Sequence, residues 1–203
     1  MNRIIPVVAG LAVVAAAGAF FVLRSDSGDR FAECRTTAIA GGTASIGGPF
    51  ELTNQNGERV TDADVIDRPS LVYFGYTFCP DVCPQDTYRN AEVAALLDER
   101  GIDVKPVMIT IDPARDTPEA MKAFVEYLSE KMVGLTGTEA EIADAARAYR
   151  VYYAKNGSGE DYLMDHSTMT YLMAPEYGFL EFFRREETEE QIADRVQCFV
   201  EKL

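Results

Sequence analysis

The most apolar stretch of the chain is an uncharged run of 20 residues near its N-terminus, from Ile4 to Leu23. In a helix that rises about 1.5 Å per residue, this run matches a hydrocarbon core of about 30 Å. We therefore predict a transmembrane anchor over residues 1–24. A cleaved signal peptide is the alternative, because Ala15 to Ala17 offer a small-residue site, but apolar residues continue beyond these alanines.

The charges around this run predict its orientation. Arg3 and the α-amino group precede it, whereas Arg24 behind it is soon offset by Asp26. Because positive charge stays in the cytoplasm, we expect the rest of the chain on the outer side. The Arg-rich and Ser-rich leader of a mitochondrial precursor is absent. The pattern indicates a bacterial inner-membrane protein with its globular part in the periplasm.

Beyond the run, residues 25–48 are small, polar and Gly-rich, which is typical of a tether, so we expect the folded domain over 49–203. Its first long strand is the apolar run SLVYFG at 70–75. Further strands are expected at 50–53 and 59–61 (a hairpin around Asn56-Gly57), 104–111, 168–173 and 179–183, and helices at 84–99, 118–131, 138–149 (leading into 151–154) and 188–202.

This order of elements predicts the fold class. Alternation of strand and helix over residues 70–131 implies parallel strands. The last two strands, joined by a tight turn at Pro175 to Gly178, form an antiparallel hairpin. We therefore expect an α/β domain with a mixed sheet, helices on both faces, and an ending of two strands and a helix.

Charge excludes one class of partner. The chain has 33 acidic and 19 basic residues, and without Arg3 and Arg24 the remainder has 17 basic residues and a formal charge of −16. Such a surface repels phosphate backbones, so nucleic-acid binding is not expected. Acidic residues also keep a domain soluble, and the charge by itself predicts no partner.

Two cysteines four residues apart mark the point where the strand at 70–75 meets its helix. Cys79 and Cys83 face the same side of the turn, near enough to form a disulfide or to share a metal. The positive end of the helix stabilises the thiolate, which is the form that binds metal. A purely structural disulfide is the alternative, but it would close a very short loop and stabilise little. The pattern favours a redox or metal site.

His166 is the only histidine in the chain, and it lies just before the strand expected from residue 168. A lone histidine is commonly a surface or hydrogen-bonded residue. Here, however, the loop that enters this strand can lie beside the loop that leaves the strand at 70–75. An imidazole would then face the two thiols. Two thiolates and one imidazole suit copper(I) in a three-coordinate site, or zinc with an added ligand.

Three methionines lie close to this histidine in the sequence: Met164, Met169 and Met173. Thioethers do bind copper. These three lack a common spacing, however, and methionine routinely fills cores, so we expect them to pack in the interior.

Three segments together resemble the SCO/SenC family. They are YFGYTFCPDVCP at 73–84, IDPARDTP at 111–118 and DHS at 165–167, and they occur in the family's order. The resemblance covers roughly residues 47–203 as well as the single anchor. It implies a thioredoxin-like fold that carries one copper, as Cu(I) or Cu(II), on Cys79, Cys83 and His166.

The resemblance also implies a function. A protein of this family would deliver copper to the binuclear copper centre in subunit II of cytochrome c oxidase. That subunit would be its main partner, with other periplasmic copper carriers as further candidates and the membrane contacted through residues 4–23.

Two enzymatic functions would use the same cysteines. A thiol-disulfide oxidoreductase would cycle Cys79 and Cys83 to reduce the acceptor's cysteines. Such enzymes normally carry CxxC and a proline opposite it, whereas this chain has CxxxC and His166, which favours metal. A peroxide-reducing relative would use one low-pKa cysteine alone, and the second cysteine and the histidine make that function the least expected.

Asp112 ends the second core strand. The resemblance implies that some members place the matching carboxylate near copper(II), which would make Asp112 an additional ligand. The other interpretation is that Asp112 holds its own loop together through Arg115.

Cys34 and Cys198 lie in the tether and in the final helix. Four cysteines allow three pairings. If Cys79 and Cys83 act together, the other two bridge each other or stay free, and free thiols are disfavoured in an oxidising compartment. We expect a structural Cys34–Cys198 disulfide that pins the tether to the last helix.

Overall fold

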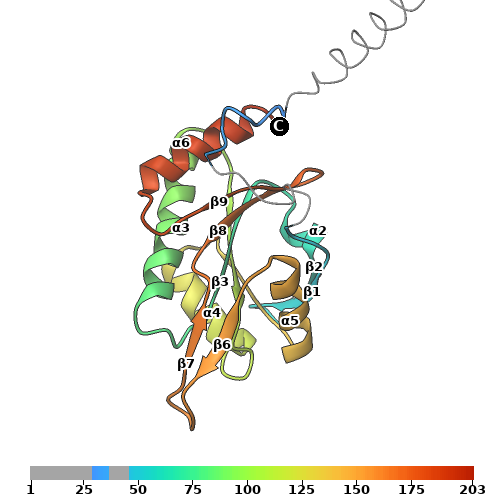
Figure 1. Cartoon of the computed structure of the whole chain (residues 1–203), viewed down its shortest axis with the longest axis vertical. Helices are drawn as coiled ribbons and strands as arrows, with labels where there is room; N and C mark the ends of the chain where they lie inside the picture. Colours follow the sequence, from blue (N-terminus) through green and yellow to red (C-terminus); the bar gives the residue numbers. More distant parts are fainter. Residues whose placement is uncertain (1–28, 37–45) are drawn as a thin grey trace, which may run out of the picture. The chain divides into compact units, whose positions relative to one another are not determined.

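The computed structural model describes residues 29–36 and 46–203 (Figure 1). The predicted anchor lies outside the described residues, and within them no helix is long and apolar enough to cross a membrane. The chain divides into two compact units, Met1–Glu33 and Cys34–Leu203. In the first unit, residues 29–33 form a turn in which the Phe31 N–H donates to the Asp29 carboxylate at 3.1 Å.

The second unit is built on a seven-stranded sheet with the order β2-β1-β5-β4-β3-β8-β9. The neighbours β3, β4 and β5 are parallel, whereas β8 is antiparallel to β3 and β1 is antiparallel to β5. This arrangement confirms the predicted mixed sheet. The strands are β1 (Glu51–Asn54), β2 (Arg59–Thr61), β3 (Ser70–Gly75), β4 (Lys105–Thr110), β5 (Val133–Thr136), β8 (Thr170–Ala174) and β9 (Gly178–Phe183).

Helices cover both faces of this sheet, as the packing of alternate residues of β4 shows. Met108 packs with Ala91 of α3 and Val125 of α4, while Val107 and Ile109 join the core beneath α5. Because side chains alternate across a strand, both faces are buried. Figure 1 shows α3 and α6 side by side on one side of the sheet. The helices are α2 (Asp62–Val65), α3 (Val82–Glu99), α4 (Pro118–Leu128), α5 (Glu139–Ala148) and α6 (Glu189–Val200).

Threonine caps set the starts of three helices. Thr117, Thr138 and Thr188 each accept a hydrogen bond from the backbone N–H three residues on, at the starts of α4, α5 and α6. This bond satisfies an N–H that would otherwise lack a partner inside the helix. The observed starts therefore lie within one residue of the predicted ones. Helix α4 ends at Leu128, earlier than predicted, because Ser129 adopts an extended backbone.

Besides the short helix α2, two parts of the fold were not predicted. The first is β5, whose glycine obscures a strand pattern. A Cβ at Gly134 would lie 3.1 to 3.3 Å from Val125 and Met121, so glycine allows α4 to pack closely. The second is a separate antiparallel pair, β6 (Tyr153–Asn156) and β7 (Leu163–His166). His166 therefore ends a strand and does not lie in a loop.

The segment at Cys34 is attached to the folded unit. Cys34 and Cys198 form a disulfide. In addition, Arg35 Nε donates to the Leu180 carbonyl at 3.1 Å, and the Thr36 N–H donates to the Glu181 carboxylate at 3.2 Å. Residues 34–36, which the sequence assigned to the tether, are thus held against β9 and α6.

Candidate metal centre

The two candidate thiols lie where β3 passes into α3. Cys79 is in the connecting loop and is 8% exposed, and Cys83 is the second residue of α3 and is fully buried. Both are free thiols, and the Cys83 N–H donates to Cys79 Sγ at 3.4 Å. A Cβ at Gly75 would lie 3.1 Å from Cys83 Sγ and 2.6 Å from the Tyr73 ring. Glycine at the end of β3 therefore leaves the space that the Cys83 sulfur occupies.

The imidazole comes from the β6–β7 hairpin. His166 Nε2 is 3.3 Å from Cys83 Sγ, and Nδ1 is 2.8 Å from the Ser167 carbonyl oxygen. Since a carbonyl only accepts, Nδ1 carries the proton and Nε2 presents its lone pair to the sulfurs. The rings of Tyr73 and Tyr76 meet the imidazole edge-on, with centroids 6.1 and 6.0 Å away. These contacts fix the orientation of the ring.

The structure brings the three residues predicted as ligands into one group. The ligand atoms of Cys79, Cys83 and His166 all lie within 4.8 Å of one another. In the part of the chain that the structure describes, no other group of three His, Cys, Asp or Glu side chains comes together in this way. Two sulfurs and one imidazole nitrogen form a soft donor set that fits copper(I), or zinc if a further ligand is added.

Hydrogen bonds give the two thiols different pKa values. The Cys83 thiol donates to Cys79, and the backbone N–H groups of Cys83, Asp81 and Val82 do the same. Together they lower the pKa of Cys79 to about 5, against the opposing effect of burial. The same side-chain bond, together with burial, raises the pKa of Cys83. At neutral pH, Cys79 is therefore the thiolate and Cys83 the thiol.

This inequality predicts a pH profile. In the reduced, metal-free protein, the initial rate at which iodoacetamide alkylates Cys79 should rise with pH around a midpoint near 5, because only the thiolate reacts. Cys83 should stay unmodified over the same range. Pulse alkylation followed by peptide mass spectrometry measures both sites, and a midpoint near 9 for Cys79 would contradict the assignment.

Asp112 is not part of the three-residue group. Its buried carboxylate accepts a hydrogen bond from the Tyr162 hydroxyl at 2.6 Å and pairs with Arg115 Nε at 2.5 Å. Of the two interpretations drawn from the sequence, these contacts match the one in which Asp112 organises its own loop.

Asp116 supports the cysteine loop, a role that the sequence did not indicate. Its fully buried carboxylate accepts from the Thr77 N–H at 3.1 Å, from the Thr77 hydroxyl at 2.5 Å and from the Thr110 hydroxyl at 2.5 Å. Thr77 lies two residues before Cys79, so these bonds tie the loop to β4. Local sequence pattern could not indicate this role, since the partner Thr77 is 39 residues away.

The methionines near His166 pack in the interior, as expected. Met173 is a member of the main core cluster, and Met164 and Met169 are partly buried against it. Their burial agrees with the usual role of methionine, which fills irregular space in a core.

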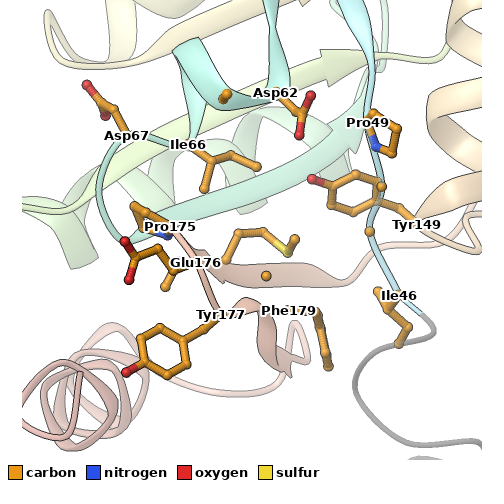
Figure 2. Close-up of a pocket in the computed structure, with 16 residues that line it drawn as sticks. Ile46, Pro49, Asp62, Ile66, Asp67, Tyr149, Pro175, Glu176, Tyr177 and Phe179 are labelled. Carbon is orange, nitrogen blue, oxygen red and sulfur yellow. The ribbon is translucent and has the colours of Figure 1, made fainter.

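A surface cavity of about 590 Å³ lies away from this group, at the C-terminal end of β8. In Figure 2 the side chains of Ile66 and Tyr149 face this space, and Asp67 and Glu176 lie at its edge. His166 precedes the other end of β8, and none of the three candidate ligands lines the cavity. The metal centre is therefore a separate site.

Comparison with known proteins agrees with these features. The SCO1/SenC family model matches residues 39–201. Protein SenC of Rhodobacter capsulatus is 50% identical over 96% of this chain and 88% of its own length. The human Protein SCO1 homolog, mitochondrial, is 44% identical over 75% of this chain, which covers 52% of that longer protein.

A solved structure extends the agreement to the fold. The crystal structure of Arabidopsis thaliana ScoI with copper bound has a TM-score of 0.74 and 40% identity, covering 77% of this chain and 99% of that one. The folded unit thus has the thioredoxin-like fold of the Sco structures, as predicted. Because the family model spans most of the sequence and one relative is half identical along nearly all of it, this chain belongs to the SCO1/SenC family.

Proposed function

We propose that this protein is a copper carrier that binds one copper on Cys79, Cys83 and His166. It would deliver the metal to the binuclear centre in subunit II of cytochrome c oxidase. The SCO1/SenC family is involved in copper binding and in cytochrome c oxidase assembly. The observation that carries the proposal is the convergence of two sulfurs and one free imidazole nitrogen within 4.8 Å, in a chain 40% identical to a copper-bound ScoI.

The arrangement of the ligands suits a carrier, which must release its metal as well as hold it. Cys79 is already a thiolate at neutral pH, so it binds metal without first losing a proton. His166 belongs to a hairpin outside the main sheet and is only partly buried. An acceptor could therefore replace the imidazole while the two sulfurs still hold the metal, and take the sulfurs afterwards.

The location is part of the same proposal: a single-pass bacterial inner-membrane protein, anchored through residues 4–23, with its folded unit in the periplasm. The apolar run supports the anchor. The Cys34–Cys198 disulfide supports an oxidising compartment, since such bonds are rare in the cytosol.

A thiol-disulfide oxidoreductase is the second candidate, and the inequality of the two thiols favours it. A low-pKa thiolate beside a buried thiol can attack an acceptor disulfide through Cys79, and Cys83 can then resolve the mixed disulfide. The product is a reduced acceptor and a Cys79–Cys83 disulfide. This activity and copper carriage are compatible, because the cysteines must be reduced to bind copper(I).

His166→Ala separates the two candidates. Two thiolates still hold copper(I), but copper(II) favours nitrogen and tetragonal geometry. We expect the variant to lose most of its copper(II) affinity and its sulfur-to-copper absorption, and to keep a measurable dithiol/disulfide potential. It should also fail to restore oxidase activity in cells that lack the parent protein.

Asp165→Ala is the matched control, because Asp165 is an exposed neighbour on the same strand and pairs only with Asn156 among the contacts described. It should behave like the unaltered protein. Normal oxidase assembly with His166→Ala, at ordinary copper supply, would show that the thiols alone suffice and would support the oxidoreductase.

A further inference from the structure

An ionic cluster lies close to Cys83; two of its members, Asp86 and Arg89, are buried on α3, and the third, Arg185, follows β9 and is more exposed. Asp86 is 2% exposed and Arg89 is 6% exposed. Asp86 Oδ1 lies 3.5 Å from Arg89 Nη1 and 4.0 Å from Arg185 Nε. One carboxylate and two guanidinium groups leave the cluster with an excess positive charge. Buried charge is unfavourable unless other groups compensate it.

Arg89 is incompletely satisfied by this pairing. Within the described residues its Nε and Nη2 atoms are buried and have no hydrogen-bond partner. A buried donor without a partner is unfavourable, and more so when it is charged. The cluster therefore keeps one positive charge that its single carboxylate does not neutralise.

A single hydroxyl connects this cluster to the metal centre. The Tyr73 hydroxyl donates to Asp86 Oδ2 at 3.2 Å, and it also lies within hydrogen-bond reach of the Cys83 sulfur. Cys83 and Asp86 lie three residues apart, on neighbouring turns of the same helix face. The ionic cluster is thus linked to Cys83 through the Tyr73 hydroxyl.

We propose that Arg89 and Arg185 act as a countercharge that favours copper(I) over copper(II) at this centre; the inference rests on the proposed copper-binding function. Two thiolates and a neutral imidazole carry a net charge of −1 with copper(I) and of zero with copper(II). A fixed positive charge in a poorly solvated interior stabilises the negative state more than the neutral one. These arginines are positioning residues that set which oxidation state is held more tightly.

Arg89→Met tests the proposal in the full chain. Copper(I) and copper(II) dissociation constants are measured separately by competition with chelators of known affinity. We expect copper(I) binding to weaken about tenfold relative to copper(II), as estimated for a unit charge acting through a protein interior. That ratio corresponds to a fall of about 59 mV in the potential of the bound one-electron couple.

Three further variants complete the experiment. Arg185→Met should shift the ratio in the same direction by a smaller factor, because its side chain is 36% exposed. Arg89→Lys keeps the charge and should keep most of the ratio. Arg100→Met is the matched control, since it removes the same charge from the far end of α3, where Arg100 pairs with Asp194.

The outcomes are distinct. If the copper(I) and copper(II) affinities fall by the same factor, or if neither changes, the arginines have only a structural role and the proposal is wrong. If Arg89→Met does not fold, Arg185→Met decides between the same results. If the unaltered protein binds no copper in either state, the proposed function itself fails.

Discussion

Replacing Cys79 or Cys83 with alanine should abolish tight copper binding. Each variant removes one of two sulfurs from a group of three ligand atoms, and the remaining sulfur and nitrogen cannot hold copper(I) as a chelate of soft donors. The fold should survive, because the change removes a single buried sulfur and costs about 1–2 kcal/mol in the interior. Equilibrium dialysis with metal counting measures the loss, and circular dichroism checks the fold.

The matched control for these variants is the other cysteine pair. Cys34→Ala/Cys198→Ala removes two sulfurs rather than one, but at a disulfide outside the group of candidate ligands. It should bind one copper per chain. Stoichiometric copper on Cys79→Ala or on Cys83→Ala at sub-micromolar free metal would rule out the site.

Removal of the Cys34–Cys198 disulfide should produce the largest loss of stability. The two residues are 164 positions apart, so the bond restrains almost the whole folded unit in the unfolded state. The chain-entropy model gives about 5 kcal/mol for a loop of this length, from which any strain in the native bond subtracts. In a unit of this size, the melting temperature should fall by roughly 10 to 20 °C.

Denaturant unfolding of Cys34→Ala/Cys198→Ala measures this change in the free energy of unfolding. The two-state slope should be checked, because a disulfide also alters the compactness of the unfolded chain. Reducing the disulfide in the unaltered protein should reproduce the result. Unfolding at the same denaturant concentration as the unaltered protein would show that the bond does not stabilise the fold.

Patterns within single elements were enough to predict most of the fold. The apolar run of β3 and the threonines that precede α4, α5 and α6 act locally, so hydrophobicity and capping identified these elements. Strand β5 was missed because it has four residues and a glycine, and its pairing with β4 depends on tertiary packing. The β6–β7 pair was missed for the same reason, since its register is fixed by partners outside each strand.

The candidate site was also predicted only in part: its ligands were found from the sequence, and its supporting residues were not. Cys79 and Cys83 are close in sequence, and the order of strands was enough to place His166 beside them. The residues that support the site could not be predicted, because each contacts a partner that is far away in the sequence. Asp116 binds Thr77 39 residues away, and Arg185 approaches Asp86 from the loop after β9. Such contacts follow from the folded arrangement and leave no local pattern.

The central claim is that one copper binds to two sulfurs and one imidazole nitrogen. Its most direct test is copper titration of the full chain with metal counting and X-ray absorption at the copper edge. The reductant should be mild enough to leave the Cys34–Cys198 disulfide intact, so that only Cys79 and Cys83 supply thiols. We predict one copper per chain with two sulfur ligands and one nitrogen ligand, and loss of the nitrogen in His166→Ala. A copper site without sulfur, or one that keeps its nitrogen ligand in that variant, would contradict the account.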